Sequence, residues 1–199
     1  LSSSSSSSSL FSSTTTTTTS SSSAASWSGP GGGVVLDDVT RMNSTTVRRL
    51  VQVRTLEDVL DALAWAREHG VAVSVRGTRH SMGGHTLHPD GLVIDMLCMN
   101  RVSFDPVSRH CVAQSGALWS DVIQLLNQHA AAPRTMQSYA SFSVGGTLSV
   151  NAHGVTSDKA LSECVQWFTL VRPDGTVLRC ERKNTDTPTD TPTDTPTDT

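Results

Sequence analysis

Both ends of the chain are low-complexity tracts, and they limit how much of it can fold. Residues 1–28 hold 16 Ser and 6 Thr, and residues 185–199 are three copies of TDTP followed by TDT. Such tracts carry too little apolar surface to offset the entropy of ordering them. We therefore expect residues 1–33, which end in a Gly/Pro run, and residues 185–199 to be disordered. The expected folded segment is residues 34–184.

The charge of the expected folded segment differs from that of the whole chain. The chain carries a net charge of -3, but all 15 Lys and Arg lie in residues 34–184, while 4 of the 18 acidic residues lie in the final tract. A nearly neutral body argues against a nucleic-acid or anionic-membrane binder, which needs a clustered basic surface. No apolar run approaches the ~18 residues of a membrane span.

The first residue and the cysteines leave the cellular context open. The chain begins with Leu, so we expect a fragment or a processed product. No cysteine pair has CxxC spacing, and we expect reduced thiols in the core, with compartment and oligomeric state unassigned. The four cysteines are Cys98, Cys111, Cys164 and Cys180.

Hydrophobic periodicity predicts a strand, a helix and a second strand between residues 48 and 75. Residues 48–53 (RRLVQV) and 71–75 (VAVSV) have strand character. Between them, Thr55 is the expected N-cap with Asp58 three residues later, and Gly70 is the expected end of the helix. This order favours a parallel strand pair joined by a crossover helix.

The later elements make the expected fold class α+β. An apolar run at residues 92–96, a strand at 109–114 and a helix at 118–129 are followed by strands at 165–171 and 176–180. The last two flank Pro173-Asp174-Gly175, a strong hairpin turn. Residues 141–154 fit no simple period. We expect one parallel unit and a terminal antiparallel hairpin.

Two glycine-rich segments carry the predicted chemistry. The first, RGTRHSMGGH at residues 76–85, begins at the end of a buried strand, where sheets of this type place ligands. The second is SVGGTLSVNAHG at residues 143–154. Glycines let the backbone approach a ligand closely, and backbone N–H groups with nearby hydroxyls suit phosphate. The spacing is neither GxGxxG nor a P-loop, so the residues alone predict two loops that share one phosphorylated cofactor.

These two segments, in this order, resemble the FAD-binding domain of the vanillyl-alcohol oxidase and p-cresol methylhydroxylase (PCMH-type) family of flavoenzymes. The hairpin FTLVRPDGTVLRC is similar to the family's next segment, so the resemblance covers roughly residues 48–181. It implies FAD as cofactor and an incomplete PCMH-type fold, a βαβ unit with a mixed sheet. It also implies oxidation of an alcohol, sugar or aldonolactone, or amine carbon by hydride transfer to flavin N5, with a small molecule as substrate.

The resemblance also implies which residues contact FAD. In many members the histidine at the place of His80 is bonded covalently to the flavin, a role that suits neutral imidazole. No Cys lies between Cys111 and Cys164, so a second covalent link is not expected. The expected cofactor-binding residues are Gly77, Thr78, Arg79, His80, Ser81, His85, Ser138, Ser143, Gly145, Gly146, Ser149 and His153.

Each of these assignments has a simpler alternative. Instead of contacting flavin, His80 could be a loop histidine that is hydrogen-bonded to backbone. His80, His85 and His88 could instead bind a metal, although we expect no metal. His153 is alternatively a cap of the turn before Gly154. Three tryptophans, Trp65, Trp119 and Trp167, are expected to pack rather than to bind substrate. Arg101 and Asp105 are expected on the surface.

The resemblance stops early at the C-terminal side. After residues 182–184 the chain enters the TDTP tract, so the end of the FAD domain and the substrate domain of the family have no counterpart in it. Family members take the catalytic base from those parts, and no catalytic residue is assigned in this chain. We expect the FAD-binding portion of a C-terminally truncated oxidoreductase. The alternative is a non-catalytic remnant with weak or no FAD binding.

Overall fold

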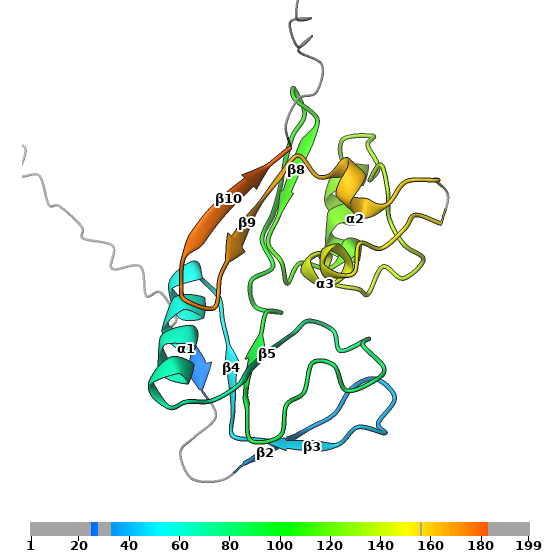
Figure 1. Ribbon diagram of the computed structural model, residues 1–199. Coiled ribbons are helices and arrows are strands. Elements are labelled where there is room, and N and C mark those ends of the chain that lie inside the picture. Colours follow the sequence, from blue (N-terminus) through cyan, green and yellow to red (C-terminus); the bar gives the residue numbers. More distant parts are fainter. Residues whose placement is uncertain (1–24, 28–32, 156, 183–199) are drawn as a thin grey trace, which may run out of the picture.

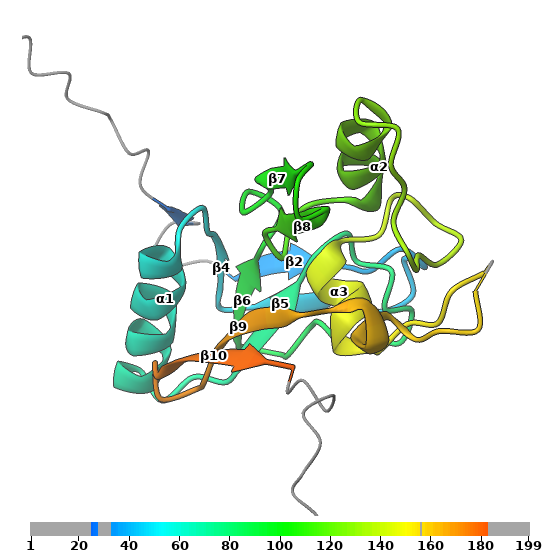
Figure 2. The ribbon, with the colours of Figure 1, turned by 90° about the horizontal axis from the view of Figure 1, so that it is seen from above.

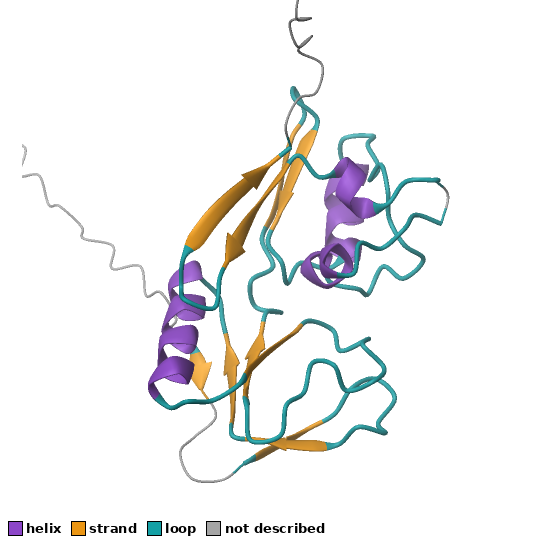
Figure 3. Cartoon of the chain, viewed as in Figure 1, coloured by secondary structure: helices purple, strands orange, loops and turns teal. Residues whose placement is uncertain are grey.

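The computed structural model describes residues 25–27, 33–155 and 157–182 (Figure 1). Nearly all of the Ser/Thr-rich tract and the whole TDTP tract lie outside these residues, so the expectation of disorder there stays a prediction. The described elements are helices and strands in mixed order (Figure 3). The α+β class is therefore confirmed.

A four-stranded sheet forms the base of the fold. Its order is β1 (Ser26–Trp27), β4 (Arg49–Gln52), β6 (Leu92–Asp95) and β5 (Val73–Arg76). Strand β6 runs parallel to both β4 and β5, whereas β1 pairs antiparallel with β4. Strand β1 precedes residue 34, the expected start of the folded segment.

The predicted strand, helix and strand are all present, but their pairing differs from the expectation. Strands β4 and β5 are not neighbours, because β6 lies between them and pairs with each. All four residues of β6 are buried. A strand covered on both faces takes the central position of a parallel sheet, and the near-continuous apolar run of β6 fits that position better than the half-exposed β5 does.

Helix α1 (Leu56–Glu68) has the predicted caps. The Thr55 hydroxyl accepts from the Asp58 N–H at 3.2 Å, and the Asp58 carboxylate accepts from the Thr55 N–H at 3.1 Å. Gly70, just beyond the helix, has a φ of +61°, which a glycine adopts without strain. The helix buries Val59, Ala62 and Ala66 against the sheet.

A second cluster of buried side chains lies around two helices. It contains Trp119, Val122 and Leu126 of α2 (Trp119–Asn127), with Leu161 of the 3-10 helix η1 (Leu161–Cys164). The predicted strand at 109–114 is β8 (His110–Ala113), and it pairs with β7 (Val102–Asp105), which the sequence did not predict. Residues 141–154 contain a short helix, α3 (Val144–Ser149), which was also missed.

Two hairpins complete the described fold. Strands β2 (Val34–Leu36) and β3 (Thr45–Val47) pair antiparallel, as do β9 (Trp167–Val171) and β10 (Val177–Glu181). The second hairpin confirms the predicted turn, in which Gly175 has a φ of +86°. Arg67 of α1 donates to the Pro173 carbonyl at 2.7 Å, which holds this turn against the helix.

The two helical regions flank the strands. Helix α1 lies on one side, α2 and α3 lie on the other, and strands β4, β5 and β6 run between them (Figures 1 and 2). Among the described residues, no helix has the length and apolar character needed to cross a bilayer.

The expectation about the cysteines was half right. All four thiols are free, as expected, but none belongs to the core. Cys111 is exposed on β8, and the other three are half-buried. Free Cys often packs inside proteins, but three of these four lie on or beside two-stranded hairpins, which bury little on either face.

Candidate functional site

The first glycine-rich segment starts from a buried ion pair. Arg76, the last residue of β5, and Asp95, the last residue of β6, lie side by side in the parallel register. Arg76 Nε donates to Asp95 Oδ2 at 2.9 Å, and Arg76 Nη2 lies 2.8 Å from the same oxygen. The pair fixes the point from which the loop leaves the carboxyl end of the sheet, the edge at which α/β sheets bind ligands.

The loop after Arg76 takes an uncommon backbone path. Arg79 has a φ of +65° and Gly84 a φ of +68°, both in the left-handed region. A non-glycine residue persists there only when its surroundings hold it, and such conformations cluster at ligand-binding sites. His80 is half-buried, and its Nδ1 lies 3.0 Å from the Thr78 hydroxyl. The imidazole is thus held by a neighbour within the loop.

The second glycine-rich segment is carried by α3. Thr147 of this helix accepts a hydrogen bond from the buried Trp119 indole at 3.0 Å, which joins α3 to α2. Gly145 N–H donates to the Ser115 carbonyl at 2.8 Å, and a Cβ at position 145 would lie 2.7 Å from Ser115 Cβ. Gly145 therefore serves a close approach between two segments of the chain, whereas the predicted approach of this loop to a ligand stays a prediction.

The two segments meet. A Cβ at position 77 would lie 2.2 Å from the hydroxyl oxygen of Ser143, the buried N-cap of α3. A Cβ at position 146 would lie 2.9 Å from the same oxygen. Next to Ser143 in the chain, Phe142 has its ring centroid 4.5 Å from that of His80. Phe142 also stacks on the exposed Tyr139. The structure thus brings Gly77, His80, Ser143 and Gly146 together.

Most of the other predicted residues are exposed or make contacts with near neighbours in the chain. Ser138 is exposed, Ser149 donates to the Gly146 carbonyl at 2.7 Å, and His153 Nδ1 lies 3.0 Å from the Gly154 carbonyl. The last contact is the turn-capping arrangement considered for His153. The His85 ring packs over Gly83, where a Cβ would lie 2.3 Å from its Cε1. Ser81 is half-buried in the same loop.

No grouping of three metal-ligating side chains occurs in residues 25–27, 33–155 and 157–182. His88, the third member of the alternative histidine set, has its Nδ1 2.8 Å from the Pro89 carbonyl. His80, as described above, faces Thr78 and Phe142. The histidine arrangement gives no support to the metal alternative.

Sequence reasoning missed the residues of the β2–β3 connection that contact the first loop, Asp38 above all. The Asp38 carboxylate, in the connection between β2 and β3, accepts from the Gly84 N–H at 3.0 Å. The Thr40 hydroxyl, with further donors from Gly84 and Asn43, lowers the pKa of Asp38 to about 2. Asp38 lies 46 residues before Gly84 in the chain and belongs to no recognisable pattern, so nothing in the sequence pointed to it.

The donors around the loops fit an anionic, polar cofactor. Arg76, at the start of the first loop, is buried, yet its Nη1 has no hydrogen-bond partner among the described residues. Buried polar atoms are nearly always paired in folded proteins, so unpaired ones indicate a partner that is not protein. With glycines 77, 145 and 146 at close approaches, these residues fit the phosphates and ring edges of a dinucleotide.

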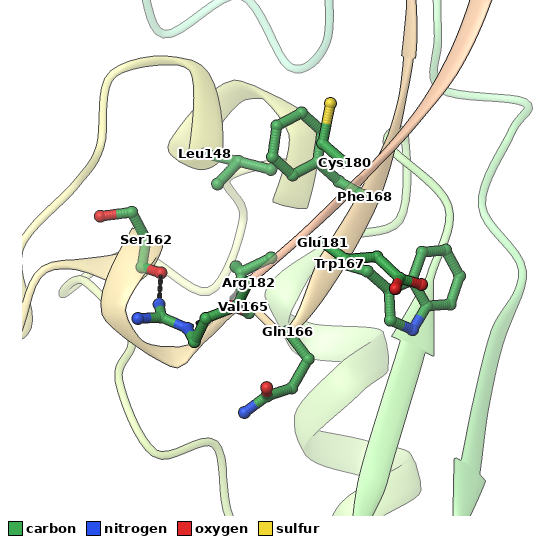
Figure 4. Close-up of a pocket in the computed structure, with 9 residues that line it drawn as sticks. All are labelled: Leu148, Ser162, Val165, Gln166, Trp167, Phe168, Cys180, Glu181 and Arg182. Carbon is green, nitrogen blue, oxygen red and sulfur yellow. Dashed lines mark hydrogen bonds between the residues drawn. The ribbon is translucent and has the colours of Figure 1, made fainter. Parts of the chain in front are cut away.

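A hollow of the described structure lies elsewhere, between η1 and the β9–β10 hairpin (Figure 4). Arg182 reaches across it to the Ser162 carbonyl, and Trp167 is more exposed than a packing role predicts. None of the residues expected to contact FAD lines it. Its lining residues are Leu148, Ser162, Val165, Gln166, Trp167, Phe168, Cys180, Glu181 and Arg182.

Comparison with known proteins decides the family. The profile of the family described as FAD binding domain matches residues 47–181, which is most of the described structure and contains both glycine-rich loops. The chain belongs to this FAD-binding family. FAD is therefore its cofactor, and the resemblance to PCMH-type flavoenzymes is confirmed. The match does not favour the alternative of a remnant without FAD.

Named relatives are oxidoreductases. An uncharacterised oxidoreductase from the fasciation locus of Rhodococcoides fascians is 35% identical over 104 residues, covering 52% of this chain and 24% of the relative. L-gulonolactone oxidase of Mus musculus is 31% identical over 138 residues, covering 68% of this chain and 31% of the relative. Cytokinin dehydrogenase 2 of Oryza sativa is 36% identical over 92 residues, covering 42% of this chain and 16% of the relative. The chain thus spans a third or less of these relatives.

A solved structure confirms the fold. The crystal structure of 6-hydroxy-D-nicotine oxidase from Arthrobacter nicotinovorans superposes with a TM-score of 0.61 at 21% identity, covering 68% of this chain and 30% of that one. The described part of the chain therefore has the fold of FAD-linked oxidases, as expected.

Proposed function

We propose that this chain forms the FAD-binding part of an oxidoreductase that oxidises an alcohol, a sugar or aldonolactone, or an amine carbon. The contact between Gly77 and Ser143, with His80 beside it, is the observation that carries the proposal. This contact connects the two glycine-rich loops at the carboxyl end of the sheet, and we propose that they form one site there. The names of the relatives, a lactone oxidase and a cytokinin dehydrogenase among them, support these substrate classes.

The proposed reaction is a hydride transfer. The substrate would lose a hydrogen with its electron pair from the carbon, and the proton of its O–H or N–H would pass to a base. FAD held by the two glycine-rich loops would supply the hydride acceptor, flavin N5, and a route for the electrons to dioxygen or another acceptor. The cofactor supplies this chemistry, and the residues of this chain bind and orient it. We propose no base within this chain, since the resemblance assigns that role to the substrate domain.

We propose the twelve predicted residues as the FAD contacts, with residues 34–184 as the FAD-binding domain between two low-complexity tracts. Four of the contacts, Gly77, His80, Ser143 and Gly146, meet at the junction of the loops. Backbone N–H groups of the first loop suit the pyrophosphate. The hydroxyls of Ser143 and Ser149 suit the ribityl chain.

We further propose that His80 bonds covalently to the flavin 8α carbon. The bond replaces one N–H and one C–H, and the two hydrogens are taken up by the flavin and passed to dioxygen. The half-buried position of the ring, its contact with Phe142 and its bond to the Thr78 hydroxyl hold it in one place, which favours attack.

Flavin absorbance after acid precipitation tests these proposals. The full chain is expressed with FAD, precipitated and washed. Covalent flavin stays yellow in the pellet, and His80→Ala is expected to release it. His88→Ala is the matched control, because its Nδ1 faces the Pro89 carbonyl and His88 lies outside both glycine-rich segments in the sequence. A wild-type chain that binds no flavin at all would contradict the proposed function.

A further inference from the structure

The connection between β2 and β3 folds around one carboxylate. Asp38 is 4% exposed and accepts four hydrogen bonds. Its Oδ1 accepts from the Thr40 N–H at 2.9 Å and the Thr40 hydroxyl at 2.6 Å. Its Oδ2 accepts from Asn43 Nδ2 at 2.7 Å and from the Gly84 N–H at 3.0 Å. Three donors belong to this connection, and the fourth belongs to the first glycine-rich loop.

A second bond joins the same two segments. Val39 N–H, next to Asp38, donates to the Arg79 carbonyl at 3.0 Å. The bonds at Arg79 and Gly84 bracket residues 80–83, and both bracketing residues have positive φ. The Asn43 side chain also packs against Gly84, where a Cβ would lie 3.3 Å from Asn43 Cβ.

These contacts hold the loop in a shape that its own sequence does not favour. Arg79, unlike glycine, pays a steric cost for a left-handed backbone, so it needs an outside constraint. The loop between β5 and β6 and the connection between β2 and β3 lie side by side at one end of the molecule (Figure 1). The bond from Val39 supplies the constraint at Arg79, and Asp38 supplies it at Gly84.

We propose that Asp38 is a positioning residue of the FAD site, which holds residues 79–84, and with them His80, in the shape that receives the cofactor. The inference rests on the proposed function of this loop and adds a residue outside both glycine-rich segments. Asp38 acts through Gly84 and Val39 and does not itself touch the cofactor.

The carboxylate is required because of its two acceptor oxygens. Each oxygen of Asp38 accepts two hydrogen bonds, whereas an asparagine amide has one acceptor oxygen and one donor nitrogen. Asp38→Asn therefore replaces one acceptor oxygen with an NH2 group and leaves two of the four donors without an acceptor. It keeps the size of the side chain and so separates hydrogen bonding from packing.

The test compares Asp38→Asn with Asp105→Asn in the full chain. Asp105 is the matched control: it also accepts from a backbone N–H, at Val107 (3.0 Å), and from a hydroxyl, at Ser108 (2.6 Å), but in the β7–β8 turn. Two quantities are measured, the hydrogen exchange of the peptide covering residues 79–84 without FAD, and the FAD dissociation constant with the shape of the flavin absorbance bands.

Asp38→Asn is expected to lose protection at residues 79–84 and to bind FAD at least ten-fold more weakly with altered bands. Asp105→Asn is expected to match wild type in both. If Asp38→Asn fails to fold, Asn43→Ala removes one donor and is expected to weaken FAD binding about three-fold.

Unchanged protection and FAD affinity in Asp38→Asn, or in Asn43→Ala where it replaces the first variant, would overturn the inference while leaving the proposed function intact. Altered exchange with unchanged FAD affinity would overturn it as well, since Asp38 would then serve only the apo fold. A wild-type chain that binds no FAD would overturn the proposed function and the inference together.

Discussion

The hydroxyl of Ser143 occupies the space where a side chain at Gly77 would begin. A Cβ at position 77 would lie 2.2 Å from Ser143 Oγ and 3.0 Å from Ser143 Cβ. Gly77→Ala must therefore turn the Ser143 hydroxyl away and crowd its Cβ, and we expect a loss of about 1–3 kcal/mol in the free energy of unfolding. FAD binding is expected to weaken by about ten-fold or more, because the separation of the loops sets the width of the site. Urea unfolding and FAD titration measure the two effects.

A second substitution tests the cause of that loss. Ser143→Gly removes both contacting atoms, and glycine is tolerated at a helix N-cap at a cost of a few tenths of a kcal/mol. The double variant of Gly77→Ala and Ser143→Gly is expected to recover most of the stability. If it is as unstable as Gly77→Ala alone, the contact with Ser143 is not the reason for the glycine.

The Arg76–Asp95 pair is expected to matter far more than a similar pair on the surface. Its side chains are 9% and 4% exposed, against 43% and 70% for Arg48 and Asp90. Removing one partner of a buried pair leaves an uncompensated charge, which costs about 3–5 kcal/mol. Asp95→Asn should therefore destabilise the chain by about that amount, and Asp90→Asn by much less, because solvent screens the exposed pair. Equal losses in urea unfolding of the two variants would contradict the assigned burial.

Local patterns were enough to predict the helices and the hairpin that depend on neighbours in the chain. Thr55, Asp58 and Gly70 act within one helix, and Pro173-Asp174-Gly175 act within one turn, so their chemistry is legible in the sequence. Helix α3 escaped prediction because its residues, VGGTLS, have poor helix propensity. The Thr147 bonds to the Ser143 and Val144 carbonyls and to the Trp119 indole support it from within the helix and from α2.

Long-range relationships could not be predicted in the same way. The insertion of β6 between β4 and β5 depends on which strand is covered on both faces, and the apolar runs of β5 and β6 look alike in the sequence. For the site, the two glycine-rich loops were predicted from the residues themselves and the role of His80 from the family resemblance, whereas the contact of Gly77 with Ser143 came from the structure. Asp38 was missed because its partner Gly84 lies in a different part of the chain.

The bond between Trp119 and Thr147 is expected to hold the second loop in place. Thr147→Val keeps the shape but leaves the buried indole N–H without an acceptor, which costs about 1–3 kcal/mol. Trp119→Phe removes the donor as well as some packing. A double-mutant cycle measures the coupling, and the loss in the double variant should be smaller than the sum of the single losses. Additive losses would mean that the hydrogen bond contributes nothing.

The stability that Asp38 contributes is expected to fall at low pH. Its pKa is lowered to about 2, first by the Thr40 hydroxyl, whereas an unfolded Asp titrates near ~3.9. A lowered folded pKa contributes stability that is present above the unfolded pKa and is lost as the pH falls through the folded pKa. The difference in melting temperature between wild type and Asp38→Asn should therefore be constant from pH 7 to about pH 5 and shrink between about pH 4 and pH 2.

Asp105→Asn is the control for this acid effect. Asp105 also has a lowered pKa, caused first by the Ser108 hydroxyl, so its variant should show the same direction of change in melting temperature. The two variants should differ in FAD binding at pH 7 and at pH 4 alike, because Asp105→Asn keeps the wild-type affinity at both and Asp38→Asn binds more weakly at both. A melting-temperature difference for Asp38→Asn that stays constant down to pH 2 would contradict the lowered pKa of Asp38, because a group with the same pKa in the folded and unfolded chain gives no such linkage.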